Sequence, residues 1–484
     1  MPELKYNSAA EIDDAYETLQ ATFRAGTTRP LSWRKHQLNQ VVLLLRENLD
    51  AIVQSFAGDL GKPRVEVITG EVGPIVRRTI QSVALLDEWA SDERVAAPDW
   101  QQSWSPTVLK RPKGVVLVIS PWNFPVFLTF QPLIGAIAAG CPAVLKLSEI
   151  GPGVSTLLAD LLPKYLDRSA YRVINGGVPE VTHLLRLKWD HITYTGNGTV
   201  GRIVAKAAAE HLTPITLELG GKSPVLIDPN TTNLKIVAKR VLWGKSRNAG
   251  QICVAPDYVL IPRAAQDAFV EAIKEAAAEL RLDDALASTD SYGSIVSEGH
   301  YRRLRNLMTT SSGTIVVGGN TNEERRRIAP TVYRDVKEGD SLLEGEIFGP
   351  LLPIVPVDDV RQAIEYIDAH PRPLVLYAFT EDPEVKQALR DETRSGGLHF
   401  NDVLSQAGVD QLPFAGVGES GYGNLTLKYT YDEFTYLRGS VDIPLTLEPN
   451  LSTRYPPYTP AVIEALAIKS GAVQAPTAAA TASA

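Results

Sequence analysis

From Val115 onward the chain alternates short β-branched runs with helical segments, and this alternation constrains the fold more than any other feature. The runs are VVLVIS at 115–120, AVLKL at 143–147, YRVIN at 171–175 and HITYT at 191–195. A second alternating series begins with PVLID at 224–228 and continues to about Asn401. Such alternation predicts right-handed βαβ units and a parallel sheet covered on both faces. We therefore expect two α/β domains with a boundary near Glu218.

Two helices are predicted ahead of this region. Ser8 and Glu11 have the spacing of a capping box, and Gly26 is suited to end the first helix. The second helix is expected after Pro30. Segment 93–111 and the residues after about 413 fit neither alternating series. The Ala-, Thr- and Ser-rich end of the chain is predicted to be disordered.

Composition and charge exclude several classes of function. The 484 residues carry 48 Lys and Arg against 56 Asp and Glu, a net charge of −8 without a basic run, which excludes a nucleic-acid partner. The two cysteines, Cys141 and Cys253, cannot form a disulfide framework and predict a reducing, cytoplasmic compartment. Neither a signal peptide nor a membrane span is predicted. Seven scattered histidines, without an HxH or HExxH pair, predict no metal site.

Two stretches match the pattern G-x-G-x-x-G, at 196–201 and 416–421. The first lies between a predicted strand and a predicted helix, as a dinucleotide site requires, and helix N–H groups there can face a pyrophosphate. The second has no helical pattern after it and predicts a turn. GGKS at 220–223 lacks the earlier glycine of a phosphate loop, so it does not predict ATP binding.

Four further segments occur in order: ISPWNFP at 119–125, LELGGKSP at 217–224, GQICV at 250–254 and EIFGP at 346–350. Together they resemble the signature segments of the NAD(P)-dependent aldehyde dehydrogenase superfamily, over about residues 10–460. YTGN at 194–197 and RYPPYT at 454–459 resemble its class 3 or fatty-aldehyde branch. The resemblance implies an α/β fold with a Rossmann-like cofactor-binding domain, an α/β catalytic domain and a small β bridging element for oligomerisation. The implied ranges are 1–92 with 112–218, then 219–412, then 93–111 with 413–449, and a tail at 450–484.

The resemblance also implies a catalytic triad of Cys253, Glu218 and Asn123. A thiolate is the most nucleophilic side chain near neutral pH, so Cys253 would add to the aldehyde carbonyl. The Asn123 amide and the Cys253 backbone N–H would hold the oxyanion, and one such donor is worth about 3 kcal/mol in other enzymes. After hydride transfer, Glu218 would activate water to hydrolyse the thioester. Without the resemblance, Asn123 reads as a turn residue and Glu218 as a structural acid, while Cys141 reads as a packing residue.

The cofactor implied is NAD, with NADP as the alternative, because an acid on the adenosine ribose disfavours a 2′-phosphate while a neighbouring lysine offsets it. The implied binding residues are Lys146 and Glu149 at that ribose, Gly196, Asn197 and Gly201 at the pyrophosphate, Trp122 along the cofactor, and Glu346 and Phe348 at the nicotinamide ribose.

A medium- or long-chain aliphatic or aromatic aldehyde is the implied substrate, if Phe124, Phe127 and Phe130 line the substrate funnel; core packing explains these residues equally well. The branch further implies a homodimer, and the tail with Lys469 and Pro476 predicts no membrane anchor. Alternatives are an apocarotenoid-type enzyme, a CoA-acylating semialdehyde dehydrogenase, which would tend to lack the Glu218 base, or a non-catalytic relative.

Overall fold

The computed structural model describes residues 4–287 and 290–467. Its contacts divide the chain into two units. The larger unit comprises Met1–Ser91 with Arg111–Tyr436, and the smaller comprises Asp92–Lys110 with the residues from Leu437 onward. The predicted disorder at the end of the chain concerns residues 468–484, which lie outside the described residues.

The N-terminal helices begin and end as the sequence predicts. Helix α1 (Ala9–Ala25) starts at Ser8, which forms both hydrogen bonds of the capping box with Glu11. It ends at Gly26, whose φ of 77° places it in the left-handed region that suits glycine. Helix α2 (Leu31–Glu47) follows Pro30, confirming the second predicted helix.

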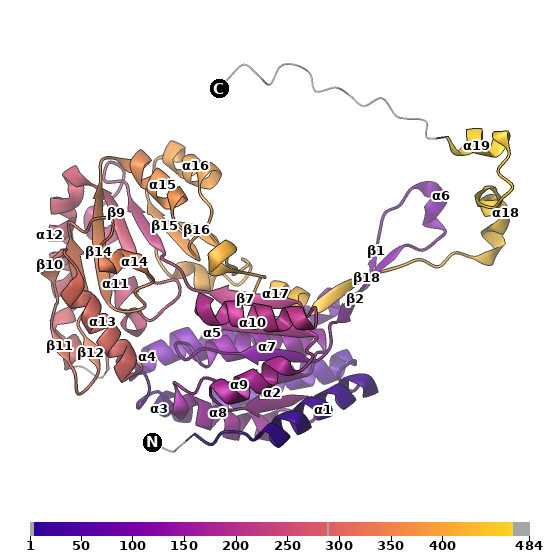
Figure 1. Cartoon of the computed structure of the whole chain (residues 1–484), viewed down its shortest axis with the longest axis horizontal. Coiled ribbons are helices and arrows are strands. Elements are labelled where there is room, and N and C mark those ends of the chain that lie inside the picture. The colour runs from indigo at the N-terminus through magenta and orange to yellow at the C-terminus, as the bar shows by residue number, and fades with distance from the viewer. Residues whose placement is uncertain (1–3, 288–289, 468–484) are drawn as a thin grey trace. The chain divides into compact units, whose positions relative to one another are not determined.

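A six-stranded sheet forms the first half of the larger unit, and its strands confirm the first alternating series (Figure 1). The strands, in spatial order, are β17 (Gly421–Tyr422), β7 (Ile215–Leu219), β6 (His191–Gly196), β3 (Val116–Ile119), β4 (Ala143–Lys146) and β5 (Tyr171–Ile174). All neighbours are parallel except β17, which runs antiparallel to β7. Because β3 has β4 on one side and β6 on the other, a crevice is expected at the carboxyl ends of these strands.

Helices cover both faces of this sheet. Successive residues of β3 enter opposite cores: Val116 and Val118 pack on one face, Leu117 and Ile119 on the other. The first core contains residues of α2, α3 (Leu49–Ser55), α5 (Gly73–Trp89), α7 (Phe127–Ala139) and α8 (Pro152–Tyr165). The second contains residues of α1, α9 (Val178–Arg186) and α10 (Gly198–Glu210). The wholly apolar sequence of β3, VLVI, follows from its burial on both faces.

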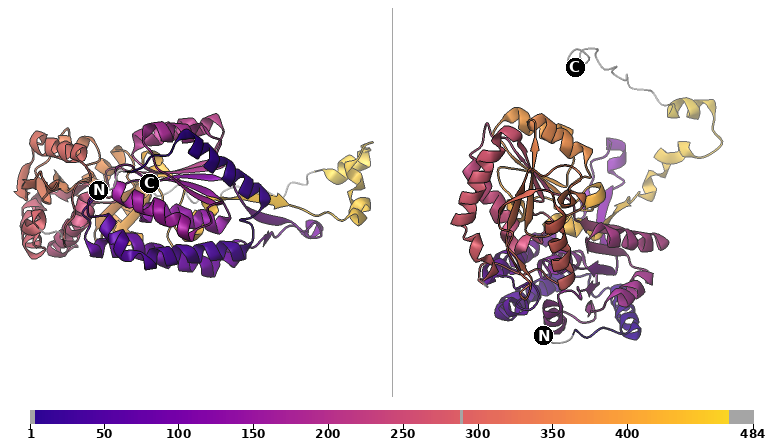
Figure 2. Two further views of the ribbon diagram at one scale, coloured as in Figure 1. Left: turned by 90° about the horizontal axis from the view of Figure 1, so that it is seen from below. Right: turned by 60° about the vertical axis from the view of Figure 1, so that its left-hand side comes forward.

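A seven-stranded sheet forms the second half of the unit and confirms the second alternating series. Its strands, in spatial order, are β10 (Thr314–Val317), β13 (Thr331–Arg334), β14 (Leu351–Val357), β9 (Tyr258–Pro262), β8 (Pro224–Ile227), β15 (Val375–Phe379) and β16 (Gly397–Phe400). Only β10 is antiparallel to its neighbour. Helices α11 (Leu234–Ser246) and α12 (Arg263–Glu279) cover one face. The other face packs against α13 (Glu298–Thr310), α14 (Ser341–Glu344), α15 (Val360–Ala369) and α16 (Pro383–Glu392), and Figure 2 shows the helices on both sides of the strands.

The smaller unit contains a three-stranded sheet, with β2 (Thr107–Pro112) between β1 (Glu93–Arg94) and β18 (Thr435–Ser440). Short helices α6 (Asp99–Gln102), α18 (Glu448–Leu451) and α19 (Pro460–Leu466) accompany it. Residues 413–436, which the sequence analysis assigns to the bridging element, lie in the larger unit instead. The reason is tertiary, since β17 pairs with β7 and α17 (Leu427–Glu433) packs on α7.

Across residues 4–287 and 290–467, none of the helices combines the length and the apolar character needed to cross a lipid bilayer.

Candidate functional site

The predicted site residues come from opposite edges of the two large sheets. At the carboxyl edge of the first sheet, Asn123 follows β3 and Glu218 is the penultimate residue of β7. At the amino edge of the second sheet, Cys253 precedes β9. The edges meet where the Asn123 side chain donates a hydrogen bond from Nδ2 to the backbone oxygen of Gln251, at 3.2 Å. Residues from two separate βα series therefore share one site.

A strained turn presents Cys253. Three consecutive residues before it, Asn248, Ala249 and Gly250, have φ of 48°, 51° and 72°. Left-handed backbone is costly for residues with a Cβ, and such strain is typical of functional sites. At Gly250 an added Cβ would lie 2.2 Å from the backbone oxygen of Gly349, so only glycine permits this close approach. The cysteine turn thereby packs directly on the EIFGP segment.

Glu218 is a buried carboxylate near the carboxyl end of β7, which lies between β6 and β17. Its neighbours in register are Thr195 on β6 and Gly421 on β17. The residue is 3% exposed, and among the described residues neither carboxylate oxygen accepts a hydrogen bond of ordinary geometry. Burial raises its pKa to about 7, while the Cys253 thiol and the Thr195 hydroxyl oppose that rise. A carboxyl group with this pKa can exchange a proton near neutral pH.

The two cysteines differ in environment. Desolvation, followed by the negative charges of Glu218 and Glu346, raises the pKa of Cys253 well above its usual value. Cys141 is fully buried, donates from Sγ to the backbone oxygen of Phe434 at 3.3 Å and has its pKa raised to about 11 by burial. The packing role predicted for Cys141 fits this geometry, whereas Cys253 is partly exposed at the meeting of the two sheets.

The first glycine loop has the strand–turn–helix context predicted for it. Gly196 ends β6, and Asn197 caps α10 by accepting a hydrogen bond from the Val200 backbone N–H at 3.0 Å. At Gly201 an added Cβ would lie 2.9 Å from Cδ2 of Leu219, so glycine lets the helix pack closely on the sheet. Free N–H groups at the start of such a helix suit an anionic ligand. The second glycine loop is a short 3₁₀ turn, Gly418–Ser420, leading into β17, as predicted.

The other predicted cofactor residues follow β3, end or follow β4, or precede β14. Lys146 ends β4, and its Nζ lies 2.6 Å from Oε2 of Glu149. The Lys146 side chain is buried, whereas that of Glu149 is one-third exposed. Trp122 and Phe348 meet edge to face, with ring centroids 5.4 Å apart. The ring contact joins the loop after β3 of the first sheet to the segment before β14.

Glu346 lies in a cluster of charges with Asp257 and Lys245. The sequence predicts a role for Glu346 but not for the other two residues. The Gly221 backbone N–H donates to the carboxylate of Glu346, and burial together with Asp257 raises its pKa to about 8. Lys245 lies in the same electrostatic cluster; it is 1% exposed, and its Nζ has no hydrogen-bond partner among the described residues. Burial lowers the pKa of Lys245 to about 8. In the sequence, the only feature that points to Lys245 is its position in WGKS, eight residues before Cys253.

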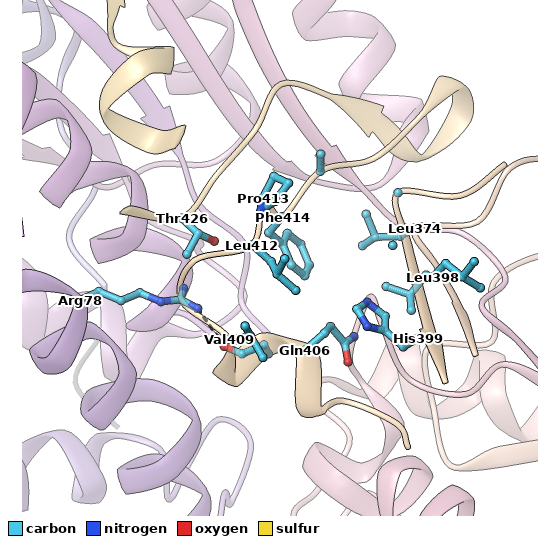
Figure 3. Close-up of a pocket in the computed structure, with 15 residues that line it drawn as sticks. Arg78, Leu374, Leu398, His399, Gln406, Val409, Leu412, Pro413, Phe414 and Thr426 are labelled. Atoms are coloured by element: carbon cyan, nitrogen blue, oxygen red, sulfur yellow. Dashed lines mark hydrogen bonds between the residues drawn. The ribbon is translucent and has the colours of Figure 1, made fainter. Parts of the chain in front are cut away.

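A cavity of about 220 Å³ lies beside this site, between the two halves of the larger unit (Figure 3). Leu374, Leu398 and His399 line it from the second sheet, and Arg78 reaches it from α5. A loop with Leu412, Pro413 and Phe414 forms another wall. Gln406 links the wall to the cysteine turn: its Nε2 donates to Tyr377 Oη at 2.8 Å, which donates to the backbone oxygen of Val254 at 2.8 Å.

The three phenylalanines predicted for a substrate funnel separate in the structure. Phe130 is fully buried in the core of the first half, so the packing alternative applies to it. Phe127 packs at the border of that core, and Phe124 packs against the core that includes Cys253. No group of three or more metal-binding side chains occurs among the residues that the structure describes.

Comparisons with known proteins agree with this geometry. The model of the family described as "Aldehyde dehydrogenase family" matches residues 2–439. The "Aldehyde dehydrogenase, dimeric NADP-preferring" of Canis lupus familiaris is 40% identical over 448 residues, covering 93% of this chain and 98% of the relative. "Aldehyde dehydrogenase family 3 member A2" of Rattus norvegicus is 42% identical over 441 residues, covering 91% and 90%. The structure titled "Substrate bound state of Staphylococcus Aureus AldH" superposes with a TM-score of 0.89 at 36% identity, covering 94% and 99%.

Proposed function

The chain belongs to the aldehyde dehydrogenase family of NAD(P)-dependent oxidoreductases, and on that basis we propose that it oxidises an aldehyde to the carboxylic acid through Cys253. The observation that carries this proposal is the convergence of three groups at one point. The Asn123 amide touches the turn that bears Cys253, and the carboxylate of Glu218 acts on the pKa of the thiol. A nucleophile, an oxyanion donor and a base are the groups that the reaction requires.

In the proposed reaction Cys253 loses its thiol proton to solvent, and its sulfur forms a bond to the carbonyl carbon. The carbonyl oxygen becomes an oxyanion, which accepts hydrogen bonds from the Asn123 amide and the Cys253 backbone N–H. A bound NAD⁺ or NADP⁺ would supply the acceptor for the hydride that leaves that carbon. Glu218 takes a proton from the water that attacks the resulting thioester. The acid leaves, and the proton held by Glu218 passes to the departing sulfur, which regenerates the thiol of Cys253.

The residues around the crevice fit a dinucleotide. The capped start of α10, with Gly196, Asn197 and Gly201, offers backbone N–H groups to a pyrophosphate. Lys146 and Glu149 would hold the adenosine ribose, because their paired charges lie at the end of the neighbouring strand β4. Trp122, Glu346 and Phe348 would hold the nicotinamide half.

We propose that both NAD and NADP are accepted. Glu149 favours a free ribose 2′-hydroxyl, since a 2′-phosphate would meet its negative charge, whereas Lys146 offsets that repulsion. The relative from Canis lupus familiaris is named NADP-preferring, and one similar solved structure, from Mycobacterium tuberculosis, is titled as a complex with NAD⁺. That structure is 27% identical, with a TM-score of 0.82 and coverage of 91% and 92%.

The proposed substrate is a medium- or long-chain aliphatic or an aromatic aldehyde. Leu374, Leu398 and Phe414 give the cavity apolar surface, and burying apolar area drives such binding. A cavity of about 150 Å³ holds benzene in another protein, so the 220 Å³ here is sufficient for one aromatic ring. We also propose a homodimer, since the relatives of this length include enzymes named dimeric.

The test is reduction of NAD⁺ and NADP⁺ at 340 nm with aldehydes from acetaldehyde to decanal and benzaldehyde. Wild-type protein is expected to reduce the cofactor, with kcat/KM rising along the aliphatic series. Cys253→Ala is expected to abolish turnover while cofactor binding persists, and Cys141→Ala is the matched control that retains activity. Retained turnover in Cys253→Ala would remove the nucleophile assignment, and an inactive wild type would remove the function.

A further inference from the structure

A short charged segment lies beneath the site and outside every motif discussed above. It runs from Lys62 to Glu71 and includes helix α4 (Arg64–Val67) and most of a π-helical turn, Ile68–Val72. Three of its charged residues are buried: Lys62 is 5% exposed, Glu66 7% and Glu71 0%. Buried charges are costly unless they are paired, so the partners of these three residues indicate what the segment does.

Lys62 and Glu71 form an ion pair with Nζ and Oε1 2.5 Å apart and both side chains fully buried. Lys62 Nζ also donates to the backbone oxygen of Asn123 at 3.0 Å and lies 3.8 Å from the ring centroid of Phe124. The second oxygen of Glu71 accepts the backbone N–H groups of Val126, at 3.2 Å, and Phe127, at 2.8 Å. One ion pair therefore holds the middle and the last residues of the loop that carries Asn123.

Glu66 reaches the other loop of the site. Its Oε2 accepts the backbone N–H of Asn248 at 2.9 Å, within the strained turn before Cys253. The Asn248 side chain then donates from Nδ2 to the backbone oxygens of Asn123, at 3.1 Å, and Gln251, at 3.0 Å. The Asn123 amide itself uses one of its two hydrogens on Gln251. Both loops are thus tied to the same ten-residue segment and to each other.

We propose that Lys62, Glu66 and Glu71 are positioning residues, which fix the Asn123 amide relative to the sulfur of Cys253 so that its second hydrogen meets the oxyanion. This inference rests on the proposed function. The three residues touch neither aldehyde nor cofactor; they act through Asn123 and Asn248. The π-helical turn that brings Glu71 to α7 is an irregularity frequent at functional sites.

The loss of kcat expected from changing these residues is limited by the contribution of the Asn123 amide, through which they act. Removing one oxyanion donor lowers kcat by about 100- to 1,000-fold in another enzyme, and a displacement of about 1 Å lowers rates by about 100-fold. Loss of the Lys62 contact is therefore expected to cost roughly 30- to 100-fold in kcat. It cannot exceed the loss caused by Asn123→Ala, because it acts through that side chain.

The experiment is a double-mutant cycle between Lys62→Met/Glu71→Gln and Asn123→Ala, measured as kcat with benzaldehyde and NAD⁺. The paired change removes both buried charges together and leaves an oxygen at residue 71 for the N–H groups of α7. We expect a loss of roughly 30- to 100-fold in the wild-type background and less than about threefold in the Asn123→Ala background. Equal losses in the two backgrounds would overturn the proposal.

Two further readouts separate positioning from general damage. Alkylation of Cys253 by iodoacetamide forms no oxyanion, so its rate is expected to stay within twofold in Lys62→Met/Glu71→Gln, and a parallel fall would contradict positioning. The control is Arg34→Met, a buried cation of the same half that donates to the backbone oxygens of Thr28 and Ala138 and not to Asn123. Its kcat per folded molecule is expected to be unchanged; a loss equal to that of the Lys62 variant would overturn the proposal.

If Lys62→Met/Glu71→Gln does not accumulate as folded protein, Glu66→Ala tests the same claim from the Asn248 side. Its effect on kcat must also disappear in the Asn123→Ala background, and an additive effect overturns the proposal. A wild type without aldehyde oxidation would refute the proposed function itself, whereas an active wild type with additive cycles would refute only the positioning role.

Discussion

The side-chain amide of Asn123 donates to the backbone carbonyl of Gln251, two residues before Cys253. This hydrogen bond joins the loop after β3 of the first sheet to the turn before β9 of the second. Oxyanion stabilisation depends on donors held in place before the reaction, because they then need no reorganisation as charge develops. The position of the Asn123 donor relative to Cys253 therefore depends on how the two halves of the larger unit pack together.

Replacing Glu218 with Gln should separate the two halves of the reaction. Reduction of NAD⁺ is expected to occur as a single burst, followed by slow turnover, because water attacking the thioester lacks its base. Stopped-flow absorbance at 340 nm measures both phases. In wild-type protein the hydrolytic rate should rise with pH through about 7, the pKa to which burial raises Glu218. A variant with full steady-state turnover would show that another group activates the water.

The rate at which Cys253 is alkylated should depend on the negative charges of Glu218 and Glu346. Glu218 and Glu346 raise the thiol pKa, so neutralising either one lowers that pKa and moves the alkylation profile with iodoacetamide to lower pH. At pH 8, Glu218→Gln and Glu346→Gln should therefore react faster than wild type. Glu419→Gln, at an exposed acid of the second glycine loop, is the matched control and should match wild type. Slower alkylation in both acid variants would contradict this electrostatic picture.

Cofactor choice should respond to the ion pair at the end of β4. Glu149→Gln removes the charge that opposes a 2′-phosphate and is expected to raise the ratio of kcat/KM for NADP to that for NAD roughly tenfold, or about 1.4 kcal/mol. Lys146→Met should shift the same ratio the other way. Initial rates with each cofactor at saturating aldehyde provide the ratios. Unchanged ratios in both variants would place the adenosine ribose elsewhere.

Asp410 should contribute strongly to stability. It accepts hydrogen bonds from Arg77, Arg78 and Gln81. Desolvation by burial raises its pKa, but these hydrogen bonds and the charge of Arg78 outweigh that effect and hold the pKa at about 2. A folded-state pKa below the unfolded value adds stability at pH above about 4, which is lost as pH falls toward 2. Asp410→Asn should cost about 3 kcal/mol at pH 7, measured by urea unfolding, because two cations lose their partner.

The control for that measurement is Asp267→Asn. Asp267 lies 2.7 Å from Arg334, but its side chain is 83% exposed, so the change should cost less than about 1 kcal/mol. Equal costs for the two variants would mean that burial of the Asp410 cluster contributes nothing.

Much of the larger unit could be predicted because its strands are buried on both faces. Such strands appear as continuous apolar, β-branched runs, and the runs at β3, β4, β5 and β6 are also separated by helices of ordinary length. The capping box at Ser8 and Glu11 is likewise a local signal. The candidate site residues could be predicted for a different reason, because they lie in segments that resemble those of a known family.

The positioning residues could not be predicted in the same way. Lys62 and Glu66 are four residues apart, as on an ordinary solvated helix face, and charged residues such as Glu71 are rarely buried. Their burial arises only when the loops of Asn123 and Asn248 close over them, a tertiary event without a local pattern. The assignment of 413–436 to the bridging element differs for a similar reason, since the pairing of β17 with β7 joins residues about 200 positions apart.

The central claim is that Cys253 carries the reacting carbon, and mass spectrometry of a stalled intermediate tests it most directly. Glu218→Gln would be mixed with NAD⁺ and benzaldehyde, quenched in acid, digested and analysed for an acyl group on cysteine. The account predicts a benzoyl thioester on the peptide that contains Cys253, in proportion to the NADH of the burst, and an unmodified Cys141. NADH formation with no acyl group on Cys253, or with the group on Cys141, would contradict it.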